Sequence, residues 1–181
     1  MLCEGQCIAP KNLCDTDNRS EAMSDSKYNV LFICVGNSAR SIFAEAILRK
    51  SAGDRFKAYS AGTRPGSELN PFAVQVLNDK GHDISTLRSK DISEFMAADA
   101  PKFNFVFTVC DHAEDEFCAA WEGQPITAHW GTKDPVKAVG NDAQKALAFQ
   151  EAYGTLKQRI DLFTSLNLAT LSQMDIQKSG T

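Results

Sequence analysis

Cys34 and Arg40 are the residues of this chain whose types and spacing most clearly suggest chemistry. They lie in the stretch VLFICVGNSARSIFAEA, where an apolar run ends at the cysteine and a helical pattern begins beside the arginine. Backbone amides, a helix N-terminus and a guanidinium all favour the ionised, nucleophilic form of a thiol. Arg40 can also offer two parallel donors to a tetrahedral oxyanion. We therefore expect a Cys34 thiolate that attacks a bound oxyanion.

The short loop between these residues is suited to holding an anion. Gly36 and Asn37 tolerate the positive φ angles that let successive N–H groups converge on one point. Ser41 can add a hydroxyl donor to the Cys34 sulfur. The alternative, a buried strand thiol and an unrelated surface arginine, does not explain the strand before the loop and the helix after it. The predicted oxyanion-binding residues are Val35, Gly36, Asn37, Ser38, Ala39, Arg40 and Ser41.

Strand-like and helix-like patterns alternate along the chain, which is typical of a parallel sheet covered by helices. Continuous apolar runs predict strands buried on both faces, and spacings of three and four predict amphipathic helices. Asn70 and Pro71 indicate the start of one helix, and Gly81 indicates its end. Strands are predicted at 30–35, 56–60, 103–110 and 126–130, and helices at 41–50, 70–81 and 141–166.

Length and composition favour one cytoplasmic α/β domain. The 181 residues are 43% hydrophobic, which is enough for a single large core. A net charge of -4 gives no general attraction to nucleic acid or acidic membranes, so anion binding must be local. No apolar run reaches the roughly 18 residues that a membrane span needs.

The two ends of the chain are expected to lie outside the domain. Residues 1–26 are polar and without periodicity, and we expect a disordered or misassigned leader. Its cysteines, Cys3, Cys7 and Cys14, lack the paired C-x-x-C spacing of zinc sites. The domain is predicted over 27–170, with a flexible tail at 171–181.

The motif C-V-G-N-S-A-R-S resembles the signature of the low-molecular-weight tyrosine phosphatase fold, and in particular of the arsenate reductases built on it. The resemblance spans roughly residues 28–165 and is supported by YSAGT, TVCDHAEDEFC and HWGTKDP. It implies a single three-layer domain with a four-stranded parallel sheet flanked by helices.

This resemblance assigns roles to three further residues. Asp134, followed by Pro135, would be the acid that protonates the departing oxygen. Cys110 and Cys118 would form a disulfide relay with Cys34, because reducing arsenate takes two electrons that thiols supply when they become a disulfide. No metal or bound cofactor is implied, but an external thiol reductant is required: thioredoxin, with glutaredoxin and glutathione left open.

The chain departs from the family pattern at several places. Phosphatases carry aromatic residues after the Asp-Pro pair, whereas Val136, Lys137 and Ala138 follow here, so a phosphotyrosine ring has no evident platform. Ala39 replaces a loop cysteine of thioredoxin-linked relatives, and the Cys110 to Cys118 spacing is one residue longer. In those relatives an Asn, a Glu, a Ser and an Asp surround a potassium ion that braces the loop. Asn37, Glu45 and Ser60 match the first three, but Lys90 stands where the Asp is expected, and its ammonium would replace the ion.

The sequence leaves three functions open. The first is reduction of arsenate, for which phosphate is an analogue. The second is a phosphatase that hydrolyses phosphotyrosine or small phosphate esters through a Cys34 phospho-enzyme. The third is a non-catalytic oxyanion-binding or redox-sensing module, against which the complete Cys, Arg and Asp set argues. Of the histidines, His82 is expected to be a surface cap, His129 to bond at a strand end, and His112 to help ionise Cys110.

Overall fold

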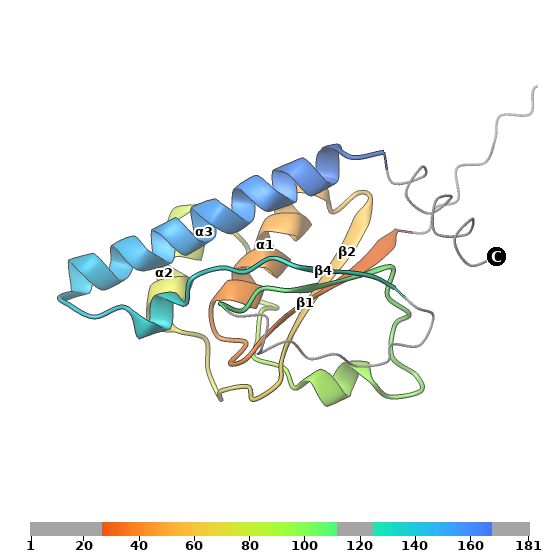
Figure 1. Cartoon of the computed structure of the whole chain (residues 1–181), viewed down its shortest axis with the longest axis horizontal. Coiled ribbons are helices and arrows are strands. Elements are labelled where there is room, and N and C mark those ends of the chain that lie inside the picture. The colour runs from red at the N-terminus through yellow and green to blue at the C-terminus, as the bar shows by residue number, and fades with distance from the viewer. Residues whose placement is uncertain (1–26, 112–124, 168–181) are drawn as a thin grey trace, which may run out of the picture.

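The computed structural model describes residues 27–111 and 125–167, and the predictions for 1–26, 171–181, His112 and Cys118 lie outside these ranges. One parallel four-stranded sheet has the order β2-β1-β3-β4 (Figure 1). The strands and helices are β1 (Tyr28–Cys34), α1 (Arg40–Ala52), β2 (Phe56–Gly62), α2 (Pro71–Asp79), β3 (Phe105–Thr108), β4 (Ile126–His129) and α3 (Asp142–Ser165), with 3-10 turns η1 (Ile92–Phe95) and η3 (Pro135–Lys137). The predicted α/β fold with a four-stranded parallel sheet is confirmed.

The three α-helices gather on one face of the sheet, and the chain around η1 covers the other (Figure 1). On the helical face, Phe163 of α3 packs edge-on against Phe105 and Phe107, at ring distances of 5.0 and 5.1 Å. On the opposite face, Tyr59 contacts Phe95 and Phe103. Both faces of the central strand β1 are therefore buried, as its continuous apolar sequence requires.

The predicted element starts agree with the structure more closely than the predicted ends. The Asn70 side chain accepts a hydrogen bond from Phe72 N, and Gly81, just beyond α2, has a φ of 67° that suits glycine. The strand predicted at 103–110 is shorter, because β3 ends at Thr108. Beyond that residue, Val109 N still donates to Ile33 O of β1, but the opposite partner strand β4 has ended.

His82 is not the surface cap that was expected. Its side chain is buried, and its Nε2 lies 2.7 Å from the Tyr153 hydroxyl of α3. Burial lowers the pKa of His82, and the nearby Lys50 ammonium lowers it further. The position after a helix-stop glycine gave no sign of this contact, because Tyr153 is 71 positions away.

No helix within residues 27–111 or 125–167 has the length and apolar character needed to cross a bilayer.

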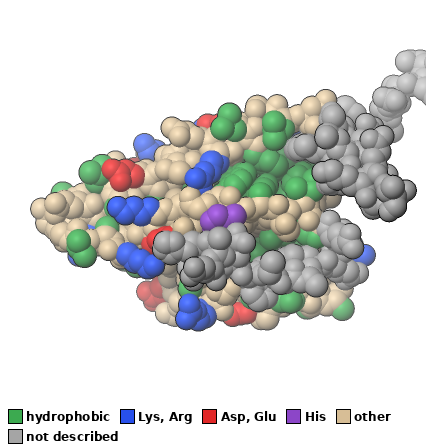
Figure 2. Space-filling view, in the orientation of Figure 1, with side chains coloured by type: hydrophobic (Ala, Val, Ile, Leu, Met, Phe, Trp, Pro, Cys, Tyr) green, Lys and Arg blue, Asp and Glu red, His purple; other side chains and the backbone are tan. Residues whose placement is uncertain are grey.

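On the face drawn in Figure 2, basic and acidic side chains are interspersed rather than collected in one patch of a single sign. An anion therefore has to be attracted by a local arrangement of groups.

Candidate active site

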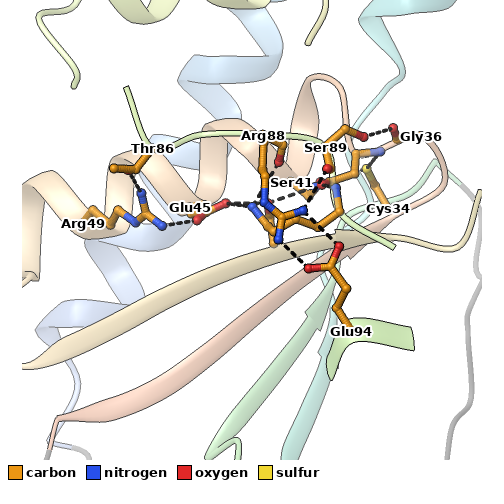
Figure 3. Close-up of polar contacts among 12 residues, drawn as sticks. Cys34, Gly36, Ser41, Glu45, Arg49, Thr86, Arg88, Ser89 and Glu94 are labelled. Atoms are coloured by element: carbon orange, nitrogen blue, oxygen red, sulfur yellow. Dashed lines mark hydrogen bonds and ion pairs between the residues drawn. The ribbon is translucent and has the colours of Figure 1, made fainter. Parts of the chain in front are cut away.

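Cys34 lies at the carboxyl end of the central strand, where the loop to α1 begins. Its sulfur is 2.9 Å from the Ser41 hydroxyl and 3.2 Å from the Asn37 backbone nitrogen, which donates to it (Figure 3). The Asn37 N–H donates to the sulfur, and the Ser41 hydroxyl is placed so that it can donate as well. Donors so placed stabilise a thiolate more than a neutral thiol.

The carbonyl groups of the Cys34–Arg40 loop point outward, toward the segment 63–70. Those of Cys34, Val35, Gly36 and Ser38 accept hydrogen bonds from Thr63, Arg64, Gly66 and Asn70, at 2.9 to 3.1 Å. In a trans peptide the N–H of the next residue points opposite to the carbonyl. The loop N–H groups therefore face away from that segment and, with the N-terminus of α1, provide donors of the kind that the predicted oxyanion site needs.

The conformation of this loop depends on Asn37 rather than on Gly36. Asn37 has a φ of 43°, in the left-handed region, whereas the backbone of Gly36 is not in that region. A glycine is required instead at Gly62 on β2, because a Cβ there would lie 2.7 Å from the Val35 carbonyl oxygen. The expected role of Gly36 in a positive-φ turn is thus wrong for this structure.

The residues predicted to brace the loop lie in contact with one another in a buried cluster. The Asn37 amide nitrogen donates to the hydroxyls of Ser41 and Ser60, at 2.8 and 2.9 Å, and its oxygen accepts from Lys90 N. Ser60 donates to Glu45, whose carboxylate is 3.0 Å from the Lys90 ammonium. Burial lowers the pKa of Lys90, and the Glu45 carboxylate opposes that shift.

An outer layer of polar contacts fastens the segment 84–92 to α1 (Figure 3). Arg49 pairs with Glu45 and donates to the Thr86 hydroxyl at 2.8 Å, and Lys90 Nζ donates to Arg88 O at 3.0 Å. Arg88 also pairs with Glu94, but both side chains are exposed, so this pair contributes little to stability. The buried Lys90 and Glu45 pair is the stronger link.

Arg40 begins α1 and points to the loops that follow β3 and β4. Its Nη2 lies 2.9 Å from Asp134 Oδ2, and its Nη1 donates to the Thr132 carbonyl at 3.1 Å and to the Asp111 carboxylate. The guanidinium is only 6% exposed. The structure thus brings Arg40 and Asp134 together from positions far apart in the sequence.

Asp134 is held by the turn that it starts. Its Oδ1 accepts a hydrogen bond from Val136 N, and Pro135 occupies the first position of η3. The side chain is 14% exposed, so a proton on it can exchange with solvent. A carboxyl group held beside the anion-binding arginine is suitably placed for proton transfer to a bound oxyanion.

Cys110 lies two residues beyond the end of β3, on the same edge of the sheet as Cys34. Both cysteines are buried, and β1 and β3 are neighbouring parallel strands. The Cys110 carbonyl accepts a hydrogen bond from Thr132 N, which joins this segment to the loop that carries Asp134. His129 Nδ1 lies 2.9 Å from the Thr108 hydroxyl, a strand-end contact of the kind predicted.

Three groups that hold Arg40 and the Cys34–Arg40 loop in place could not be identified from the sequence. Asp111 and Thr132 both contact Arg40, and the backbone of the segment 63–70 orients the loop carbonyls. Asp111 was visible beside Cys110, but its partner lies 71 positions away. Contacts made by backbone groups carry no residue-type signal.

Comparison with known proteins points in one direction. The profile of a family described as low molecular weight phosphotyrosine protein phosphatase matches residues 29–174. A protein of Halalkalibacterium halodurans named arsenate reductase is 36% identical over 138 residues, which cover 76% of this chain and 96% of that protein.

Two solved structures agree with that match. An arsenate reductase in the phosphate binding state has a TM-score of 0.62 and 26% identity, covering 75% of this chain and 95% of the other. A thioredoxin-dependent arsenate reductase of Corynebacterium glutamicum has a TM-score of 0.59 and 25% identity, covering 81% of this chain and 65% of the other.

Proposed function

Because the chain belongs to the low molecular weight phosphotyrosine protein phosphatase family, and the members just compared with it are named arsenate reductases, we propose that it reduces arsenate to arsenite. The observation that carries the proposal is the position of two buried cysteines, Cys34 and Cys110, at the same edge of neighbouring parallel strands. A phosphatase needs only the first thiol. A reductase needs a second one close by to receive the sulfur of the first.

In the proposed first step the Cys34 thiolate attacks arsenic while the loop N–H groups and Arg40 hold the arsenate oxygens. Asp134 donates its proton to the departing oxygen, which leaves as water. The product is a thiol ester of arsenate on Cys34, with arsenic still in its pentavalent state. This step is the same chemistry with which a phosphatase begins.

In the second step the Cys110 thiolate attacks the Cys34 sulfur. A Cys34–Cys110 disulfide forms, the electron pair of the sulfur–arsenic bond stays on arsenic, and trivalent arsenite leaves. Cys118 then attacks Cys110 and frees Cys34. An external thiol reduces the resulting Cys110–Cys118 disulfide, and the thioredoxin-dependent relative supports thioredoxin over glutaredoxin with glutathione. We place this chemistry in the cytoplasm, where such thiols stay reduced.

The residues after Asp134 support an inorganic substrate. Val136 and Lys137 are exposed side chains of η3, and neither offers a flat ring against which a phosphotyrosine could stack. A phosphatase that hydrolyses a Cys34 phospho-enzyme would leave Cys110 without a function. Slow hydrolysis of a small phosphate ester remains compatible with the shared first step.

The test is arsenite release measured with thioredoxin and its reductase, with glutaredoxin and glutathione, or with no reductant. Cys118→Ser should release about one arsenite per chain and stop as a Cys34–Cys110 disulfide, visible by mass spectrometry of peptides. Cys110→Ser should release none. Sustained thioredoxin-linked turnover by Cys118→Ser would contradict the relay, and full phosphatase turnover without arsenite release would contradict the proposed function.

A further inference from the structure

Asp111 links Arg40, which would bind the oxyanion in the first proposed step, to Cys110, which would attack in the second. It directly follows Cys110 in the chain, and its carboxylate forms an ion pair with Nη1 of Arg40. The two side chains are 17% and 6% exposed. A charged pair this well buried is sensitive to loss of either partner, because the remaining charge is left without compensation.

The hydrogen-bond donors of Arg40 show what this pair does. Nη1 carries two hydrogens, and both have acceptors: the Asp111 carboxylate and the Thr132 carbonyl. Nη2 forms an ion pair with Asp134, at 2.9 Å from its Oδ2. Among the residues that the structure describes, no hydrogen bond from Arg40 other than the two from Nη1 is found, which leaves the Nε and Nη2 hydrogens for an oxyanion. Asp111 and Thr132 thus hold Nη1 of the guanidinium in place, while the side with Nε and Nη2 stays available to an oxyanion.

The same contacts tie Arg40 to the cysteine of the relay. Thr132 N donates to the Cys110 carbonyl at 3.2 Å, so Arg40, Thr132, Cys110 and Asp111 form a closed ring of contacts. Lys137 also approaches Asp111, at 3.9 Å, but its side chain is 68% exposed and solvent screens the attraction. Arg40 is therefore the principal partner of Asp111.

We propose that Asp111 is a positioning residue that couples oxyanion binding to the segment carrying Cys110. An oxyanion that engages Arg40 stabilises the orientation in which Arg40 holds Asp111, and so keeps Cys110 in place until the first step is complete. Because such coupling is reciprocal, loss of the Asp111 contact with Arg40 lowers the affinity of the site for the oxyanion. This inference rests on the oxyanion site of the proposed function but not on the reduction of arsenate.

The experiment measures initial rates of iodoacetamide modification of Cys34 and Cys110 in the reduced full-length protein, with and without inorganic phosphate. Peptide mass spectrometry separates the two cysteines. In the wild-type protein, phosphate should slow the reaction of iodoacetamide with both Cys34 and Cys110. In Asp111→Asn, phosphate affinity read from Cys34 should fall by about tenfold, the usual effect of losing one charge-assisted hydrogen bond. Phosphate should then no longer protect Cys110.

Two further variants separate positioning from a general effect on folding. Asp111→Glu keeps the charge and should restore part of the phosphate affinity and part of the protection of Cys110. Asp79→Asn removes an exposed carboxylate at the end of α2 and should behave as the unmodified sequence does. Both readouts unchanged in Asp111→Asn would overturn the inference and leave the proposed function intact.

Two other outcomes are equally informative. Faster modification of Cys110 in the presence of phosphate would mean that the oxyanion displaces Asp111 from Arg40, which also overturns the inference. Failure of phosphate to protect Cys34 in the unmodified sequence would count against the oxyanion site itself, and with it the proposed function.

Discussion

The Cys34 sulfur has its donors in place before any substrate arrives. Ser41 and the Asn37 amide lie within 3.2 Å of it, and Asn37 is itself held by Lys90 N and Ser60. Preorganised donors of this kind stabilise charge without reorganising during the reaction. These contacts make Cys34 the cysteine that we expect to act as nucleophile.

Cys34→Ser is expected to abolish both arsenate reduction and hydrolysis of p-nitrophenyl phosphate. Both reactions begin with the same thiolate attack, and a serine hydroxyl does not ionise near neutral pH. Arsenite release and p-nitrophenol absorbance measure the two activities. Turnover near the normal rate in either assay would show that another residue is the nucleophile.

Asp134→Asn is expected to slow formation of the first adduct by about 10²- to 10⁴-fold, the usual range for loss of a general acid. Asparagine keeps the contact with Val136 N, so the turn should remain intact. Rapid-mixing kinetics with arsenate measure the step directly. Thiol titration should still count the same reactive cysteines, and an unchanged first step would place the acid elsewhere.

At the scale of elements, the Lys90 ammonium links the segment before η1 to α1 and, through Glu45, to β2. Lys90 reaches Glu45 of α1, and Glu45 accepts a hydrogen bond from Ser60 of β2. The family resemblance implies a potassium ion at the equivalent place in relatives, and here the Lys90 ammonium occupies that place. Because the positive charge belongs to a lysine side chain, we expect the contacts that hold the loop not to depend on the potassium concentration.

Activity and melting temperature should therefore respond little to potassium, compared with choline at the same ionic strength.

Lys90→Met is expected to cost about 1–3 kcal/mol of unfolding free energy, because the Glu45 carboxylate loses its buried ammonium partner and keeps only Arg49 and Ser60. Adding Glu45→Gln to that variant should recover part of the loss. Urea unfolding measures all three proteins, and strong saturable activation by potassium would contradict this role of Lys90.

The elements around Cys34 were predictable because their signals are local. A continuous apolar run, a short loop and helical spacing over adjacent residues suffice for β1 and α1. The end of β3 was not predictable, since it depends on where β4 ends. The Arg40 and Asp111 contact was missed for the same reason: an isolated carboxylate does not reveal a partner 71 positions away.

At the scale of the whole molecule, His82 joins the end of α2 to the long helix α3 through the Tyr153 hydroxyl. Burial, aided by Lys50, lowers the pKa of His82 in the folded protein. The unfolded chain therefore binds a proton more readily than the folded one below about pH 6.5. Unfolding free energy is lost as the pH falls through that region.

The melting temperature should accordingly fall between pH 7.5 and pH 5.5, and it should fall less in His82→Gln. Glutamine does not titrate, so the folded and unfolded chains no longer differ in proton uptake at this position. Differential scanning calorimetry at the two pH values gives the comparison. An equal drop in both proteins would assign the acid sensitivity to other groups.

The contacts of Arg40 also bear on when the protein becomes active during its own synthesis. Arg40 meets Thr132 across 92 positions, and Arg159 of α3 in turn donates to the Thr132 hydroxyl. The nucleophile therefore leaves the ribosome long before its acid and the helix that supports the acid loop. A nascent chain that carries Cys34 but not yet α3 lacks these contacts to Arg40, so we expect it neither to bind phosphate nor to start the reaction. Catalytic competence is expected only after α3 has been released.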